Sequence, residues 1–169
     1  MQEAVNLFAS IVYAALSAFI AILSVYIGLM AFTRLTRNID EVAELKRGNI
    51  AVGVTLAAVA VVIGLVTLKA IPIITVEFLS GRIVSAIILA VIQLGTNILV
   101  AVFTQFVVIG IFNELTSRRG LNQFEEVRRG NMAIGVGLAG IILMVGIILQ
   151  PASEMVTDSV TSMLRAVIG

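Results

Sequence analysis

KRGNIAVGV at residues 46–54 and RRGNMAIGV at residues 128–136 are two copies of one phrase. Each copy has two positive charges, then Gly-Asn, and then a long apolar run. Glycine readily ends a helix and asparagine readily caps the start of the next one. The phrase therefore predicts an elbow between two helices, and its repetition indicates a duplicated unit.

Four apolar blocks surround the elbows, at about 7–32, 49–74, 83–112 and 131–150. An α-helix needs roughly 20 residues to cross a hydrocarbon core about 30 Å thick, and each block reaches that length. The chain is 60% hydrophobic and 12% charged, whereas a soluble domain carries about 25% charged residues. The sequence therefore predicts an all-α integral membrane protein with four transmembrane helices.

The two copies divide the chain into repeats. Asn49 and Asn131 align at an offset of 82 residues, and FTRLT at 32–36 matches FNELT at 112–116 at an offset of 80. We expect a first hairpin repeat at 1–80 with its elbow at 33–48, and a second at 81–150 with its elbow at 113–130. Both hairpins start on the same side, so the repeats are predicted to be parallel. After Pro151, apolar residues recur on one helical face, which predicts an amphipathic surface helix at 151–169 capped by Ser153.

Each elbow is predicted to hold a short helix on the membrane surface. Asn38 is a candidate cap, Asp40 and Glu41 suit the positive end of the helix dipole, and Lys46 and Arg47 suit the negative end. Asn122 begins the same device in the second elbow. A structural turn is favoured over a ligand site for the asparagines. The elbow and lipid-headgroup residues are Lys46, Arg47, Gly48, Asn49, Arg128, Arg129, Gly130 and Asn131.

The charge distribution predicts an orientation in the membrane. The two elbow segments hold eight of the 11 Lys and Arg residues, and loops rich in these residues stay in the cytoplasm. We therefore expect a multi-pass protein of the cell (inner) membrane with both termini outside the cytoplasm.

The paired hairpins, the F-x-x-L-T entry and the [KR]-R-G-N-x-A-x-G elbow resemble a family of bacterial and archaeal membrane proteins called domain of unknown function 350. The resemblance is most specific over 32–64 and 112–146, and the segment after Pro151 does not map onto the family pattern. It implies a four-helix inner-membrane protein made of two repeats, and it implies no activity.

Two sets of residues depart from the apolar background of the blocks. Small residues that permit close helix packing are Gly53, Ala57, Gly64, Gly135, Ala139 and Gly146. Polar residues form a stripe in each repeat, at matching heights by the offset of 80: Tyr13, Ser17 and Ser24 in the first, Gln93, Asn97 and Thr104 in the second. The stripes either hydrogen-bond to each other and join the first and third helices, or they line a polar path.

Several classes of function are disfavoured. The chain has no cysteine and no histidine, which removes thiolate nucleophiles and the commonest zinc ligands. It also lacks a nucleotide-binding glycine loop and an HExxH motif, and a net charge of +1 gives no reason to expect nucleic-acid binding. We expect no enzyme, metal or cofactor. Because no ionisable residue lies in the middle of a block, proton- or sodium-coupled transport is disfavoured too.

Two hypotheses of function remain. The first is a scaffolding membrane protein that assembles as a homo-oligomer through the Gly53–Gly64 and Gly135–Gly146 faces. Its basic elbows would contact lipid headgroups, or a cytoplasmic or membrane protein partner. The alternative is a passive channel or pore for ions or small polar solutes, lined by the two polar stripes.

Overall fold

The computed structural model describes residues 2–35, 40–68, 70–117 and 123–168. Every regular element in these ranges is an α-helix. Four helices in the described part of the chain are long and apolar enough to cross a membrane. The protein is therefore an all-α membrane protein, as the sequence predicts. Within these ranges the structure describes all side chains except those at 2–6, 9, 35, 105, 108–109, 112–117, 124 and 168.

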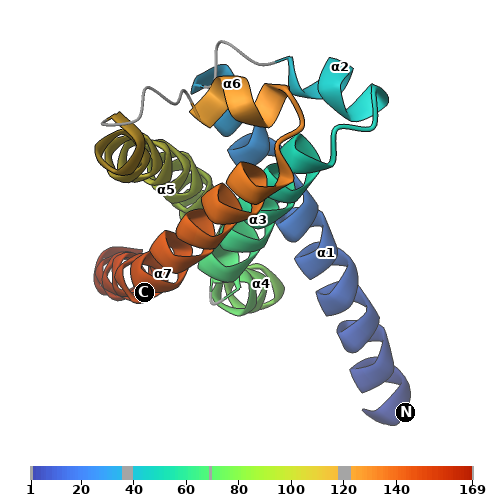
Figure 1. Ribbon diagram of the computed structural model, residues 1–169. Coiled ribbons are helices and arrows are strands. Elements are labelled where there is room, and N and C mark those ends of the chain that lie inside the picture. The colour runs from blue at the N-terminus through green and yellow to red at the C-terminus, as the bar shows by residue number, and fades with distance from the viewer. Residues whose placement is uncertain (1, 36–39, 69, 118–122, 169) are drawn as a thin grey trace.

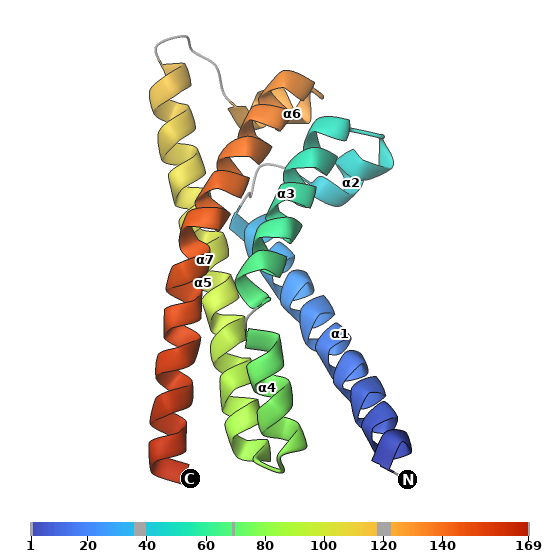
Figure 2. The same cartoon turned by 90° about the horizontal axis from the view of Figure 1, so that it is seen from below.

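The helices follow one another as two hairpins with short surface helices at their bends (Figure 1). Their bounds are α1 Gln2–Leu35, α2 Glu41–Lys46, α3 Ile50–Thr67, α4 Ala70–Leu79, α5 Ile83–Ser117, α6 Gln123–Arg128 and α7 Met132–Ile168. The elbow helices α2 and α6 lie at one end of the molecule, and both termini lie at the other (Figure 2). Towards its N-terminus α1 diverges from the other helices (Figure 2).

The second apolar block is two helices, where the sequence predicted one. α3 ends at Thr67 and α4 begins at Ala70. Pro72 is the third residue of α4, and proline has no backbone N–H and clashes with the carbonyl four residues before it. Proline is tolerated in the first turn of a helix, so Pro72 favours a new start there. The continuous span predicted at 49–74 is therefore wrong.

At Pro151 the sequence predicted a boundary between two helices, whereas the structure has one continuous helix. Residues after Pro151 are helical, as predicted, but they continue α7 to Ile168 and form no separate surface helix. Ser153 lies inside α7 and is buried, so it does not cap a helix start. Side-chain contacts that Ser153 and Thr157 make with the rest of the bundle hold α7 in place on the far side of the proline.

The glycines of α7 let it lie directly against α3. A Cβ on Gly135 would come within 2.8 Å of the Ala51 Cα, and one on Gly146 would overlap Val62. Ala139 is buried in the same contact region. The face from Gly135 to Gly146 is therefore occupied within the chain, and the prediction that a second copy binds there is wrong. On α3, by contrast, Gly64 has open space around it.

The buried apolar residues form two separate clusters. The elbow-side cluster joins α1, α3, α5, α6 and α7, and its members include Phe32, Ile63, Val100 and Ile142. The far cluster joins α4 and α5 through Ala70, Ile74, Ala86 and Leu89, with Ile20 of α1 packed against it. The end of α3 lies between the two clusters.

The contact between α7 and α3 predicts different costs for two glycine substitutions. Gly146→Ala forces a methyl group into Val62, so we expect it to cost about 1–3 kcal/mol of stability. Gly64→Ala adds a methyl group where nothing lies within 4 Å, and alanine favours the helix by up to about 1 kcal/mol. Thermal unfolding in detergent measures both. Equal effects of the two substitutions would contradict this packing.

Candidate functional site

The interrupted end of α3 is satisfied by side chains from two neighbouring helices. Gln93 on α5 and Ser153 on α7 both donate hydrogen bonds to the Val66 carbonyl, with donor–acceptor distances of 3.4 Å. Thr67 donates to the Ile63 carbonyl at 2.7 Å. The last carbonyls of a helix have no partner within the helix, and an apolar bundle offers no bulk water to replace one. These side chains therefore stabilise the break.

The same side chains also bond to one another. The Asn97 Oδ1 atom accepts from Gln93 Nε2 at 3.2 Å, and it lies 3.2 Å from Thr67 Oγ1, whose single proton is shared with the Ile63 carbonyl. Thr157 Oγ1 donates to Gln93 Oε1 at 3.3 Å. We call Thr67, Gln93, Asn97, Ser153 and Thr157 the polar layer. It connects α3, α5 and α7 between the two hydrophobic clusters, and all five residues are buried.

The polar stripe of the second repeat is thus buried as a unit, but it does not bond to the stripe of the first. Gln93, Asn97 and Thr104 are buried on α5 and Ser24 is buried on α1, while Tyr13 and Ser17 are half-buried. The hydroxyls of Ser17, Ser24 and Thr104 and the Asn97 amide nitrogen have no hydrogen-bond partner. The hypothesis that hydrogen bonds between the stripes join α1 to α5 is therefore wrong.

The stripes are also out of register. Ile20 packs against the far cluster, which contains Ala70 and Leu89, and Gly28 lies against Ile63. Ser24, one helical turn from each, is therefore at the level of Thr67 and the polar layer. The repeat offset of 80 would instead place Ile20 beside Val100, which belongs to the elbow-side cluster.

Sequence reasoning missed the contribution of α7 to this layer. Ser153, Thr157 and Thr161 recur every fourth residue and are all buried. That spacing, which places them on one helical face, was the available signal. The prediction of a surface helix after Pro151 obscured it.

The elbows have the geometry that the sequence predicts. Gly48 and Gly130 have φ values of +76° and +81°, in the left-handed region that favours glycine. The Asn49 side chain accepts from the Val52 N–H, and that of Asn131 accepts from the Ile134 N–H, so both cap helix starts. The cap of α2 is Asp40, which accepts from the Ala43 N–H. The predicted caps Asn38 and Asn122 lie outside the described residues.

Asn49 also fastens the two elbows together. Its Nδ2 atom donates one proton to the Glu44 carboxylate at 2.9 Å, and the other is shared between the Val127 and Arg128 carbonyls at the end of α6, each at 3.0 Å. Asn131 makes only the equivalent of the last bond, to Glu126, among the described contacts. Asn49 therefore links the first elbow to the second, whereas the side-chain amide of Asn131 bonds only within its own elbow among the described contacts.

The basic residues of the elbows are partly neutralised. Arg47 pairs with Glu44, Arg128 with Glu125, and Arg129 with Glu125 and Glu126. The Arg128 guanidinium, hydrogen-bonded to Glu125, holds the pKa of that carboxyl below its ordinary value. Gly48, Lys46 and the guanidinium groups remain exposed at the surface of the molecule.

A second charged group lies at the opposite end. Glu77 on α4 is buried and bonds to Arg82, at 2.6 and 3.1 Å, and to Arg165 on α7, at 3.0 and 3.2 Å. The Arg82 hydrogen bond holds the pKa of Glu77 below its ordinary value, burial acts in the opposite direction, and Arg165 lowers the pKa further. This group ties α4, the start of α5 and the end of α7 together.

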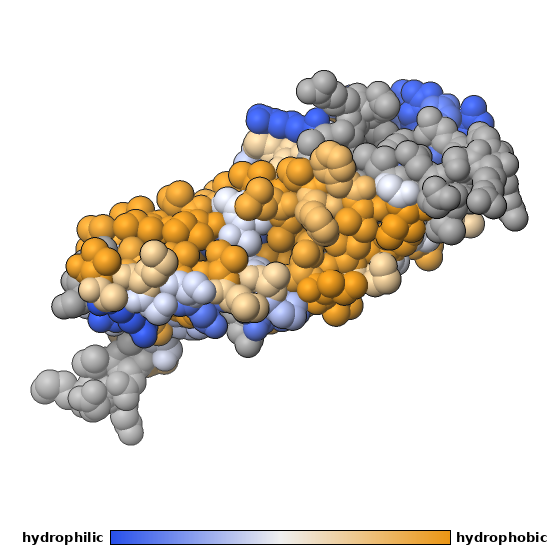
Figure 3. Space-filling model, turned by 90° about the vertical axis from the view of Figure 1, so that its left-hand side faces the viewer, coloured by the Kyte–Doolittle hydropathy of each residue, from blue (hydrophilic) through white to orange (hydrophobic). Residues whose placement is uncertain are grey.

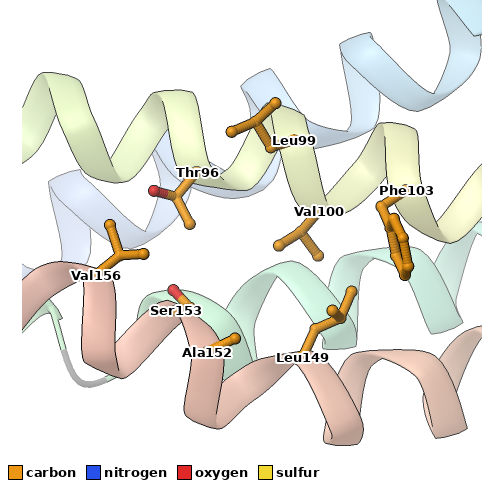
Figure 4. A pocket seen from close by; sticks show the side chains of 8 residues that line it. All are labelled: Thr96, Leu99, Val100, Phe103, Leu149, Ala152, Ser153 and Val156. Carbon is orange, nitrogen blue, oxygen red and sulfur yellow. The ribbon is translucent and has the colours of Figure 1, made fainter.

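An open groove of about 160 Å³ lies between α5 and α7 (Figure 4). Thr96 and Ser153 are the polar side chains that line it, and the rest of its lining is apolar, including Leu99, Phe103 and Val156. Such a groove suits an apolar side chain or an acyl chain. Within the described residues, no cluster of three His, Cys, Asp or Glu could hold a metal ion.

This architecture defines the class of the molecule as a multi-pass α-helical membrane protein with a polar layer at an interrupted helix. The family model for Domain of Unknown Function (DUF350) matches residues 5–152, and the chain belongs to that family. The match ends inside α7, so Thr157 and Arg165 lie beyond it. No curated protein and no solved structure matches the chain.

The polar layer predicts unequal effects for two threonines on α7. Thr161 donates to the carbonyl of the residue four before it, whereas the single hydroxyl proton of Thr157 is shared between the Ser153 carbonyl and Gln93 Oε1. We expect Thr157→Val to cost about 1 kcal/mol more than Thr161→Val, because it leaves Gln93 Oε1 without its donor. Chemical or thermal unfolding of the two variants measures the difference, and equal costs would argue against the bond to Gln93.

Glu77 predicts a pH dependence. A carboxylate whose folded-state pKa is lowered stabilises the fold above its unfolded pKa, about 4.3 for glutamate. That stabilisation is lost as the pH falls through the folded-state pKa. We therefore expect Glu77→Gln to reduce the unfolding temperature at pH 7, with a deficit that shrinks below about pH 4. A deficit that is constant with pH would contradict the charge pairing.

Proposed function

We propose that this chain is a non-catalytic scaffolding protein of the cell membrane that assembles with copies of itself. The observation that carries the proposal is the height of its exposed apolar surface. α7 has 37 residues and is therefore about 55 Å long. Met132 near its start and Val167 near its end are 43% and 84% exposed, although the hydrocarbon core is only about 30 Å thick.

Helix tilt alone does not reconcile these lengths. A helix would need a tilt well above the usual range of about 0–40° to bring both ends of α7 inside the core. Figure 3 shows one face of the molecule on which hydrophobic residues cover most of the long dimension, with hydrophilic residues near the ends. Contact with another copy is the arrangement that removes the excess apolar surface from water.

The outer half of α1 is the segment best suited to that contact. Leu7, Phe8, Ile11 and Phe19 are each about 60–70% exposed, and α1 diverges from the other helices in this region (Figure 2). α3 offers a second surface, because Ala57 is exposed and Gly64 has open space around it. Of the two small-residue faces that the sequence suggested for assembly, the one on α3 thus remains in the proposal.

In this proposal the elbows lie on the cytoplasmic side and contact lipid headgroups or a protein partner. The side chains of Arg47 and Arg129 are 74% and 66% exposed, so they can reach anionic headgroups or an acidic partner. Val42 and Leu45 on α2 are exposed beside them, as a helix resting on a membrane surface requires. Because several of the arginines also bond to glutamates, we expect only modest attraction to anionic lipid.

A passive pore is the second candidate. The buried polar atoms of Ser24, Asn97 and Thr104 that lack partners favour it, because polar groups that line a path bond to what passes through. Liposomes that contain the purified chain separate the two candidates: the scaffold gives no flux of ions or small solutes, and the pore gives flux that Asn97→Leu abolishes.

The orientation predicts the outcome of cysteine labelling. The natural chain has no cysteine, so single cysteines at Ser117 and Ser159 report cleanly. A membrane-impermeant thiol reagent should label position 159 from outside the cell and position 117 from the cytoplasm. Labelling of both positions from one side would contradict the proposed topology.

Self-assembly predicts crosslinks along α1. A single cysteine at Phe19 should form a disulfide between two copies in native membranes. The matched control is the same variant in nanodiscs loaded with one chain each, where no crosslink should form. A monomeric mass in lipid, together with no crosslink in membranes, would exclude the proposed assembly.

A further inference from the structure

A pocket of about 430 Å³ lies between α4 and the C-terminal part of α7. Figure 2 shows both segments at the end of the molecule opposite the elbow helices α2 and α6. One lining side chain comes from α4, and the others recur at intervals of three and four residues along one face of α7. The lining residues are Ile73, Asp158, Thr161, Ser162 and Arg165. The proposed scaffold assigns no role to this pocket.

The pocket lies at the height of lipid headgroups. α7 begins at Met132 beside the second elbow, and the rise from there to Asp158 is about 39 Å along the helix axis. The hydrocarbon core of a bilayer is about 30 Å thick, and the bilayer with its headgroups is about 40–45 Å thick. When the elbows lie at one membrane surface, α7 therefore carries Asp158 past the core and into the headgroup layer of the other surface.

The charged group around Glu77 gives one side of the pocket a positive charge. Arg82 and Arg165 both bond to the buried Glu77 carboxylate, at 2.6 and 3.0 Å. Two guanidinium groups on one carboxylate leave one net positive charge. The Arg165 side chain is 57% exposed and bonds to Glu77 through Nε and Nη2. Because a guanidinium has five N–H donors, Arg165 keeps others for a second anion.

The neighbouring side chains on α7 supply acceptors. Asp158 is exposed, and the ion pairs found among the described residues at this end join Glu77 to arginines and do not include Asp158. Thr161 and Ser162 donate their hydroxyl protons to backbone carbonyls of α7, so their oxygens remain acceptors. A carboxylate and two hydroxyl oxygens on one helical face match a primary ammonium group, which has three N–H donors.

A pocket with an anion site and an ammonium site matches a zwitterion. We propose that it binds a phosphate ester of ethanolamine, with the phosphate against Arg165 and the ammonium group against Asp158 and the two hydroxyls. At headgroup height the source of this group is phosphatidylethanolamine, and Ile73 supplies apolar surface for the start of its acyl chains. A choline headgroup lacks the N–H donors that Asp158 would accept. This inference goes beyond the proposed scaffold and does not depend on self-assembly.

The test measures lipid binding to the purified full chain in detergent by native mass spectrometry. The probes are phosphatidylethanolamine and phosphatidylcholine with identical acyl chains, and free O-phosphoethanolamine is the competitor. The variants are Asp158→Asn, which removes the ammonium partner, and Arg165→Gln, which removes the phosphate partner. Glu154→Gln is the control for the first, because Glu154 is one turn earlier on α7 and does not line the pocket. Arg82→Gln is the control for the second, because it also removes a partner of Glu77 but lies outside the lining.

We expect phosphatidylethanolamine to bind about tenfold more tightly than phosphatidylcholine, the ratio that one additional charge-assisted hydrogen bond gives. Asp158→Asn should abolish this preference and Glu154→Gln should retain it. Arg165→Gln should weaken the binding of both lipids, which share the phosphate, and Arg82→Gln should not.

The competitor distinguishes the two sources of the ligand. Displacement of the lipid by an equal concentration of O-phosphoethanolamine identifies a soluble ester as the ligand, and retention of the lipid identifies the headgroup. Equal binding of the two lipids, or a preference that Asp158→Asn retains, overturns the proposal. Unchanged binding of both lipids to the Arg165→Gln variant overturns it as well.

Discussion

A helix that stops inside an apolar bundle must have partners for its last carbonyls, and the rest of this structure is arranged around that requirement. Where α3 ends, Gln93 and Ser153 donate to the Val66 carbonyl from α5 and α7. Asn97 and Thr157 then fix Gln93 in place. An unsatisfied carbonyl at this position would cost about 1–3 kcal/mol, so the break and the polar residues on the other helices require each other.

The two sequence repeats form equivalent elbows but different membrane helices. Both elbows have a left-handed glycine and a capping asparagine, because these local devices depend on a few neighbouring residues. Above the elbows the copies diverge. α3 breaks while α7 continues through Pro151, and Gly146 packs tightly while its counterpart Gly64 does not. The part of α7 beyond the family match supplies Thr157 to the polar layer and Arg165 to the charged group at Glu77.

The sequence predicts those features that depend on local patterns. Apolar length gives the four membrane helices, and the Gly-Asn pairs give the elbows, because hydropathy and capping act over one or two turns. The two prolines have opposite effects that local sequence does not distinguish. Pro72 marks a helix start and Pro151 lies within a continuous helix, and the difference depends on contacts with distant helices. The polar stripe on α5 was recognisable, but its partners on α3 and α7 depend on tertiary packing that periodicity does not encode.

The most direct measurement is the distance between the Gln93 side-chain nitrogen and the Val66 carbonyl carbon. Rotational-echo solid-state NMR on isotope-labelled protein in lipid bilayers measures it. The account predicts strong dephasing, as expected for a nitrogen 3.4 Å from the carbonyl oxygen, together with backbone shifts that end one helix at Thr67 and begin another at Ala70. No dephasing, with helical shifts running unbroken from Ile50 to Leu79, would contradict it.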